Sequence, residues 1–256
     1  MIALKLTLVP AFLLVVSMSG KWWGPTIAGW LAGLPVVAGP ILFLLVLEHG
    51  SAFGARAATL SLSAVLASEA FNFAYAWNCR AKPWPIALTT GLIAWLLTAG
   101  FLSFLPVSPL WAIGVALAAV LFGQAFLPRS QVTAASSPLT RSDLAGRMAA
   151  GAVLTILVTA LSSSVGPTWS GLFAVFPLLG IVLSVSSHRA HGPDFVISLL
   201  RGMVLCRFSF AAFCVCLIFT LPHQSVLVAF AESAILSILV QWTTKRLANA
   251  QRGRLG

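Results

Sequence analysis

Long apolar segments alternate with short polar connections along the whole chain. A membrane-spanning helix needs about 20 consecutive, mostly apolar residues, and nearly every segment reaches this length. Nine spans are predicted, with bounds 4–19, 25–47, 54–77, 86–104, 108–127, 144–163, 168–187, 197–220 and 222–242. The pattern therefore predicts an all-α integral membrane protein without a soluble domain.

Composition supports this class and excludes a soluble enzyme. The 256 residues are 59% hydrophobic and 8% charged, whereas an average soluble domain has about 25% charged residues. No phosphate-binding loop, nucleophile elbow or pair of loop carboxylates occurs, so enzymatic activity, a cofactor and a metal are not expected. His188 and His191 have only Asp194 as a nearby acid. An intramembrane enzyme acting on lipids is the alternative within this class.

The charges indicate topology rather than a nucleic-acid partner. The net charge is +10, but the basic residues are scattered between spans instead of being clustered on one face. If nine spans alternate, one side receives eleven Lys and Arg residues and the other receives Lys5 and Arg56. The positive-inside rule then predicts a bacterial inner-membrane protein whose amino terminus is outside and whose carboxyl terminus is cytoplasmic.

An internal repeat relates the two halves at an offset of 142 residues. Gly24-Pro25-Thr26 recurs as Gly166-Pro167-Thr168, and the same offset aligns six further identical pairs without a gap. Nine identities fall in these thirty positions, mostly on Gly, Pro and His rather than on the commonest apolar residues. The six further pairs are Gly29 with Gly171, Ala32 with Ala174, Pro35 with Pro177, His49 with His191, Gly50 with Gly192 and Phe53 with Phe195. The pattern indicates a duplication.

The offset pairs spans one to four with spans six to nine and leaves span five as a connector. An odd number of crossings between the copies gives them opposite orientations. The predicted organisation is a first repeat (1–105), a linker helix with a polar loop (106–143), and a second repeat with a basic cytoplasmic tail (144–256). Inverted repeats are typical of secondary transporters. The alternative is that duplication only doubles a stable four-helix unit.

One stretch of the second half resembles a known family. Ser170-Gly-Leu-Phe-Ala-Val-Phe-Pro177, followed by an apolar helix and a turn with His, Arg and Gly, resembles the GlpM-type small bacterial inner-membrane proteins. Those are four-helix chains with a Gly-Leu-x-Pro-x-Phe-Pro signature, whose first proline this chain lacks. The resemblance covers residues 145–220 and, more weakly, 20–78. It implies a fused, inverted pair of such units and supplies no mechanism.

Proline and buried charge mark the candidate site. Pro35, Pro40 and Pro177 predict broken helices, because proline removes a backbone hydrogen bond and clashes with the preceding turn. The small residues around them are equally consistent with close helix packing. A charge inside a span must find a partner, an aqueous cavity or a ligand.

Only Glu69, Arg207 and Glu232 fall deep within predicted spans. Similar depths predict that Glu69 and Arg207 approach each other, with Glu232 as a second acid. A carboxyl group would carry a coupling proton, and Arg207 would hold an anion. The alternative is a structural ion pair.

Two repeat-equivalent histidines, His49 and His191, lie at predicted helix ends, where each is a gate or, more simply, a cap. The most favoured function is secondary transport of a small solute or lipid-linked molecule. The alternative is a non-transporting accessory or assembly subunit of a membrane or envelope complex. The expected partners are the lipid bilayer, a small solute, and a second copy or another subunit of such a complex.

Overall fold

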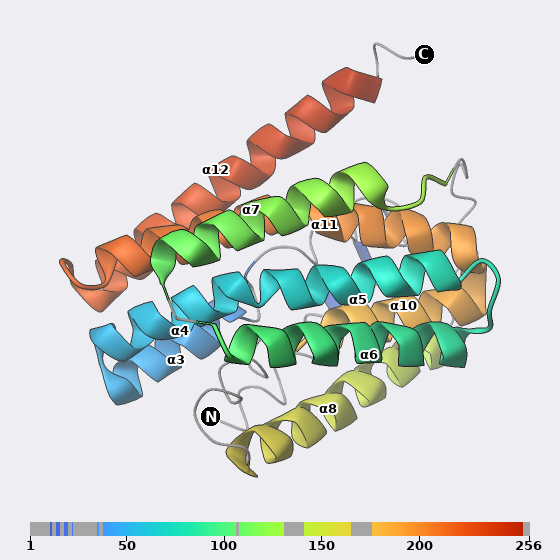
Figure 1. Ribbon diagram of the computed structural model, residues 1–256, viewed down its shortest axis with the longest axis horizontal. Coiled ribbons are helices and arrows are strands. Elements are labelled where there is room, and N and C mark those ends of the chain that lie inside the picture. The colour runs from blue at the N-terminus through green and yellow to red at the C-terminus, as the bar shows by residue number, and fades with distance from the viewer. Residues whose placement is uncertain are drawn as a thin grey trace.

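A computed structural model describes residues 38–105, 108–130, 141–164 and 176–252, together with isolated positions between 11 and 22 and position 35. Within these residues the chain forms helices joined by short connections (Figure 1). The helices are α3 (Ala38–His49), α4 (Ser51–Ser63), α5 (Val65–Asn78), α6 (Trp84–Ser103), α7 (Pro109–Phe126), α8 (Arg141–Ser164), α10 (Leu178–His191), α11 (Pro193–Thr220) and α12 (Val226–Arg252).

Five segments are long and apolar enough to cross a membrane. They are Ser51–Asn78, Trp84–Ser103, Pro109–Phe126, Pro193–Thr220 and Val226–Thr244, and they match the predicted spans three, four, five, eight and nine. Large apolar side chains on their outer faces are exposed, among them Leu97 at 70% and Leu110 at 79%. Such faces suit lipid, and the chain is a helical, multi-pass membrane protein. Most of predicted span one, and the first parts of spans two and seven, lie outside the described residues.

The helix boundaries differ by the same 142 residues that relate the sequence motifs. Helices α3 and α10 end at His49 and His191, and each is followed by a glycine in the left-handed region, Gly50 at φ 86° and Gly192 at φ 81°. The next segments are Ser51–Asn78 and Pro193–Thr220, both 28 residues long. Helices α6 and α12 begin at Trp84 and Val226, which also differ by 142.

The packing follows the same correspondence. Helix α4 packs on α3 and α5 packs on α6, just as α11 packs on both α10 and α12. Helix α7 contacts α4, α5 and α11, so it lies between the two halves. In Figure 1, α4 and α5 run in the opposite direction to α11, and α6 runs in the opposite direction to α12.

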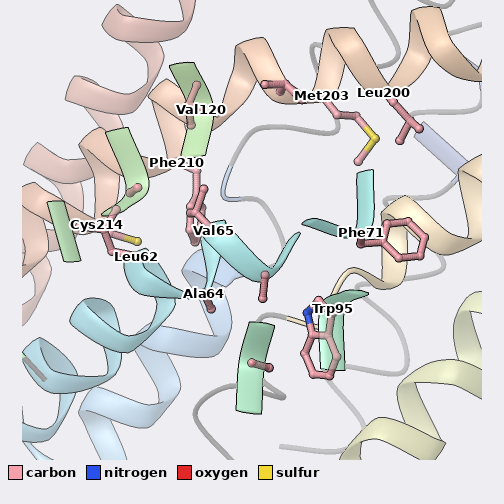
Figure 2. Packing of buried hydrophobic residues seen from close by; sticks show 14 of the residues in the cluster. Leu62, Ala64, Val65, Phe71, Trp95, Val120, Leu200, Met203, Phe210 and Cys214 are labelled. Carbon is pink, nitrogen blue, oxygen red and sulfur yellow. The ribbon is translucent and has the colours of Figure 1, made fainter. Parts of the chain in front are cut away.

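The interior is apolar and is built where α5, α7 and α11 meet. Figure 2 shows Val65, Val120 and Phe210 from these three helices in one cluster. In lipid, helices associate through close packing and polar contacts rather than through exclusion of water. Gly91 of α6 illustrates the close approach, because a Cβ there would lie 2.8 Å from the ring of Phe71.

The long segment Ser51–Asn78 is interrupted at Ala64, whereas α11 is continuous. Two side chains just before the interruption bond to the preceding turn: Thr59 Oγ1 donates to the Ala55 carbonyl at 2.9 Å, and Ser63 Oγ donates to the Thr59 carbonyl at 3.2 Å. Such back-bonds often bend helices. The bend was not predicted, because the segment has no proline.

Candidate functional site

An ion pair joins the two halves in the interior. Arg207 Nε donates to Glu69 Oε1 at 3.0 Å, and the two side chains are only 16% and 5% exposed. Glu69 lies on α5 and Arg207 on α11, close to the middle of its 28-residue span. The predicted approach of these two residues is confirmed. A lone charge at this depth would cost several kcal/mol, so each side chain stabilises the ionised form of the other.

The carboxylate has a second donor and a tight neighbour. Asn72 Nδ2 donates to Glu69 Oε2 at 3.3 Å from one turn further along α5. A Cβ added to Gly123 of α7 would lie 3.3 Å from the same oxygen and 3.0 Å from a methyl group of Val204. Glycine at position 123 therefore allows α7 to pass beside the carboxylate.

Unsatisfied polar atoms surround this pair on one side. Ser68 Oγ and Asn72 Oδ1 of α5 are buried and have no hydrogen-bond partner among the described residues. The same holds for Ser184 Oγ of α10. Asn72 Oδ1 faces α10 at Gly180, one turn before Ser184, because a Cβ on Gly180 would lie 3.9 Å from it. Buried polar groups almost always find a partner. These atoms can bind water or a small polar solute next to the ion pair.

Glu232 is not brought to this site, and the predicted trio is wrong in that respect. It lies on the exposed face of α12 and forms no ion pair with any residue that the structure describes. Helix α12 turns Ser233, Ser237 and Gln241 inward instead, and Ser237 bonds with Ser209 of α11. Depth along a span is readable from a sequence, but the rotation of a helix without strong amphipathicity is not.

The predicted proline breaks are placed in part. Pro177 directly precedes α10 and Pro35 lies in a turn three residues before α3, so both helices begin just after repeat-equivalent prolines. Pro40 is in the first turn of α3, where proline is tolerated. The residues before Pro35 and Pro177, including both Gly-Pro-Thr motifs, lie outside the described residues.

The two histidines occupy equivalent surroundings. The ring of His49 stacks on Phe53 with centroids 4.7 Å apart, and the ring of His191 stacks on Phe195 at 4.4 Å. Each is the last residue of its helix, so the helix-end prediction is confirmed. Nothing in these contacts tests a gating role.

Several basic residues meet at one end of the bundle. Arg80 Nη2 donates to the Arg129 carbonyl at 2.8 Å and lies 3.4 Å from Asp194 Oδ1. The guanidinium of Arg189 lies 6.0 Å from the ring centroid of Trp84 at the start of α6. The ends of α5, α7 and α10 and the starts of α6 and α11 therefore share one side of the molecule (Figure 1).

Sequence reasoning missed the residues that complete the site. Asn72 could have been found, because it is three residues after Glu69 and so lies on the same helix face. Gly123 and Ser184 carry no such signal, because they reach the site only through the packing of α7 and α10. Comparison with known protein families, curated proteins and solved structures gives no match to this chain.

Proposed function

We propose that this protein is a secondary transporter of a small solute or lipid-linked molecule in a bacterial inner membrane, with Glu69 and Arg207 in its pathway. The observation that carries the proposal is the buried ion pair, at 3.0 Å, between corresponding long helices of the two halves. Ionisable residues at this depth mark pathways and coupling sites in membrane proteins. The unsatisfied oxygens of Ser68, Asn72 and Ser184 supply further polar contacts beside the pair.

The proposed architecture is an inverted repeat of four helices around α7. The shared offset of 142 residues in helix ends, glycine turns and His–Phe stacks supports it. The opposite directions of α5 and α11 in Figure 1 also fit such a repeat. Transporters with inverted repeats bind their substrates near the midplane between the two halves, which is where Glu69 and Arg207 meet. The GlpM-type resemblance adds the proposal that each half derives from such a unit.

The chemistry of the pair suits coupling of an anion to a proton. A guanidinium binds carboxylate or phosphate oxygens through two parallel donors. A substrate anion that took the place of the Glu69 carboxylate on Arg207 would leave that carboxylate without its cation. Glu69 would then bind a proton, since a lone carboxylate in this interior is costly. One anion and one proton would thus occupy the site together.

The proposed orientation places the end with Arg80, Arg129 and Arg189 in the cytoplasm. Lys and Arg are enriched in cytoplasmic loops, and this end contains the contacts of Arg80 with Arg129 and Asp194. The carboxyl-terminal end of α12 lies on the same side in Figure 1. The amino terminus is then outside if nine spans are present.

Uptake by reconstituted protein tests the function even while the identity of the substrate is open. Liposomes containing wild type, R207Q or no protein would be exposed to a mixture of small anionic metabolites under an imposed pH gradient. Mass spectrometry of their contents should show solutes that accumulate with wild type and not with R207Q. Equal contents in all three preparations would contradict transport.

The alternative function is an accessory subunit of a membrane complex, and Glu232 favours it. This carboxyl group lies on an exposed face of α12 shared with Val228, Ile235 and Leu239, which are 47%, 59% and 53% exposed. A carboxylate facing lipid is unfavourable, whereas a partner helix with a donor at that depth would satisfy it. Loss of a co-purifying subunit in E232Q, with equal uptake by wild-type and R207Q liposomes, would favour this alternative.

A further inference from the structure

A second site lies at the basic end of the bundle, apart from the ion pair. A cavity of about 610 Å³ opens between α6, α8 and α10, and neither Glu69 nor Arg207 lines it. This volume is within the range of about 300–1,000 Å³ that is usual for ligand pockets. Its polar lining includes Arg147, Arg189 and Ser186, and no acidic residue lines it. The apolar part of the lining includes Leu88, Leu154, Ile181, Val182 and Val185.

The charged and apolar linings are separated along the helices. Leu154 follows Arg147 by seven residues on α8, and Ile181 precedes Arg189 by eight residues on α10. At about 1.5 Å per residue, each arginine lies roughly 10 to 12 Å from the apolar residue on its helix. Helix α8 begins and α10 ends at the same side of the bundle (Figure 1). The cavity therefore has a cationic end near the membrane surface and an apolar end deeper in the bilayer.

The cationic end is built into the wall. Arg147 is only 6% exposed, whereas Arg189 is exposed and lies near the ring of Trp84. A Cβ added to Gly146 would meet nothing within 4 Å, and Ala150 also lines the cavity. Small residues beside the arginines leave space for a headgroup, and a tryptophan at this level is typical of the membrane interface.

We infer that this cavity binds an anionic amphiphile whose phosphate group lies between Arg147 and Arg189 and whose acyl chain lies along the apolar lining. Arginine matches the geometry of phosphate oxygens. Basic pockets between membrane helices on the cytoplasmic side bind anionic lipid headgroups. The separation of charge from apolar surface distinguishes this ligand from a wholly polar solute. The inference does not depend on whether the Glu69–Arg207 site transports.

Lipid binding to the full-length chain in a neutral detergent tests the headgroup end. Native mass spectrometry would measure binding of phosphatidylglycerol and of phosphatidylcholine to wild type, R147Q, R189Q and R129Q. Arg129 is exposed at the same end and does not line the cavity, so R129Q is the control for loss of charge alone. Wild type should prefer phosphatidylglycerol, and R147Q and R189Q should each weaken its binding about tenfold, as expected for loss of one charge-assisted contact. R129Q should bind as wild type does.

Two tryptophan substitutions on α8 test the acyl-chain end. Ala150 lines the cavity, whereas the neighbouring Ala149 is exposed and does not. A150W should reduce binding of phosphatidylglycerol at least tenfold, and A149W should leave it unchanged. Glycerol phosphate, which has the headgroup but no chain, should bind far more weakly than the lipid. Binding of glycerol phosphate as tight as that of the lipid would overturn the inference in favour of a free-anion site.

The outcome is decided with folded protein. Each variant should elute as a single species with the thermal unfolding midpoint of wild type. If R147Q does not fold because the arginine is buried, the exposed R189Q and the A150W–A149W pair still decide the question. Equal lipid binding by R189Q and R129Q, together with equal binding by A150W and A149W, would overturn the inference.

Discussion

Arg207 Nε lies 3.0 Å from Glu69 Oε1, and this contact links α5 of the first half to α11 of the second. Both residues lie in 28-residue segments whose boundaries are 142 residues apart. The pair therefore connects corresponding helices at the place where the two halves meet. Its surroundings, with Asn72 on one side and Gly123 on the other, leave the carboxylate enclosed by three helices.

Removing one member of this pair should strongly destabilise the fold. Loss of one partner leaves an unpaired charge in the interior, which costs about 3 kcal/mol or more. R207Q should lower the free energy of unfolding by this amount, and the double variant E69Q/R207Q should lose less than the two single variants together. Denaturant titrations of the detergent-solubilised protein would measure both effects.

The exposed pair of Arg80 and Asp194 provides the control for that measurement. Both side chains are 48% exposed and their atoms are 3.4 Å apart. Exposed pairs contribute about 0–1 kcal/mol, so D194N should have a small effect. Equal losses for D194N and R207Q would mean that burial adds nothing to the Glu69–Arg207 contact.

Gly123 should tolerate no larger side chain. A Cβ there would lie 3.0 Å from a methyl group of Val204 and 3.3 Å from Glu69 Oε2. G123A should therefore destabilise the protein by about 1–3 kcal/mol, as overpacking does. On the same helix, a Cβ on Gly114 would meet nothing within 4 Å, so G114A is a matched control. Unfolding midpoints that fall equally in both variants would indicate a general effect on α7 rather than a contact with the carboxylate.

The approach of Glu69 and Arg207 was predictable because it depends on depth. A charge in an apolar segment is conspicuous, and its distance from the segment ends gives its level in the bilayer. The boundaries of the later helices were predictable for the same reason. The Gly-Pro-Thr motifs and the His-Gly pairs supplied the offset that the helix ends also follow.

Glu232 shows what such reasoning could not supply. Its depth was readable, but the face of α12 that packs on α11 is set by Ser233, Ser237 and Gln241. Exposed and buried positions of a membrane helix are both apolar, so hydrophobic periodicity does not determine which face is inward. The bend at Ala64 was missed for a different reason, since back-bonding by Thr59 and Ser63 is a weak and common pattern.

Cys79 should react slowly with thiol reagents in the folded protein. It is 2% exposed, and burial raises the pKa of its thiol to about 11. Because the thiolate is the reactive form, only about one molecule in a thousand would be reactive at pH 8. Cys206 and Cys214 are also buried, whereas Cys216 is partly exposed.

Mass spectrometry after brief treatment with a maleimide should therefore find at most one modified cysteine, Cys216, in folded protein. All four cysteines should be modified after denaturation. Rapid modification of Cys79 in folded protein would contradict its burial beneath the connection between α10 and α11.

The proposed inverted arrangement predicts opposite sidedness for its two equivalent histidines. His49 and His191 end α3 and α10, which point to opposite ends of the bundle in Figure 1. In a background without native cysteines, H49C should be labelled by an impermeant maleimide from outside the cell, and H191C from the cytoplasmic side. Labelling of both from the same side would rule out an inverted repeat.

The most direct test of the transport proposal is water access to the polar atoms beside the ion pair. Ser68 is fully buried next to Glu69, and S68C retains both charges. Ala67, which is equally buried but apolar, provides the control A67C. In vesicles containing folded protein without native cysteines, a water-soluble maleimide should label S68C and leave A67C unlabelled. Absence of labelling at both positions would mean that Glu69 and Arg207 form a dry structural pair, and would contradict a transport pathway through them.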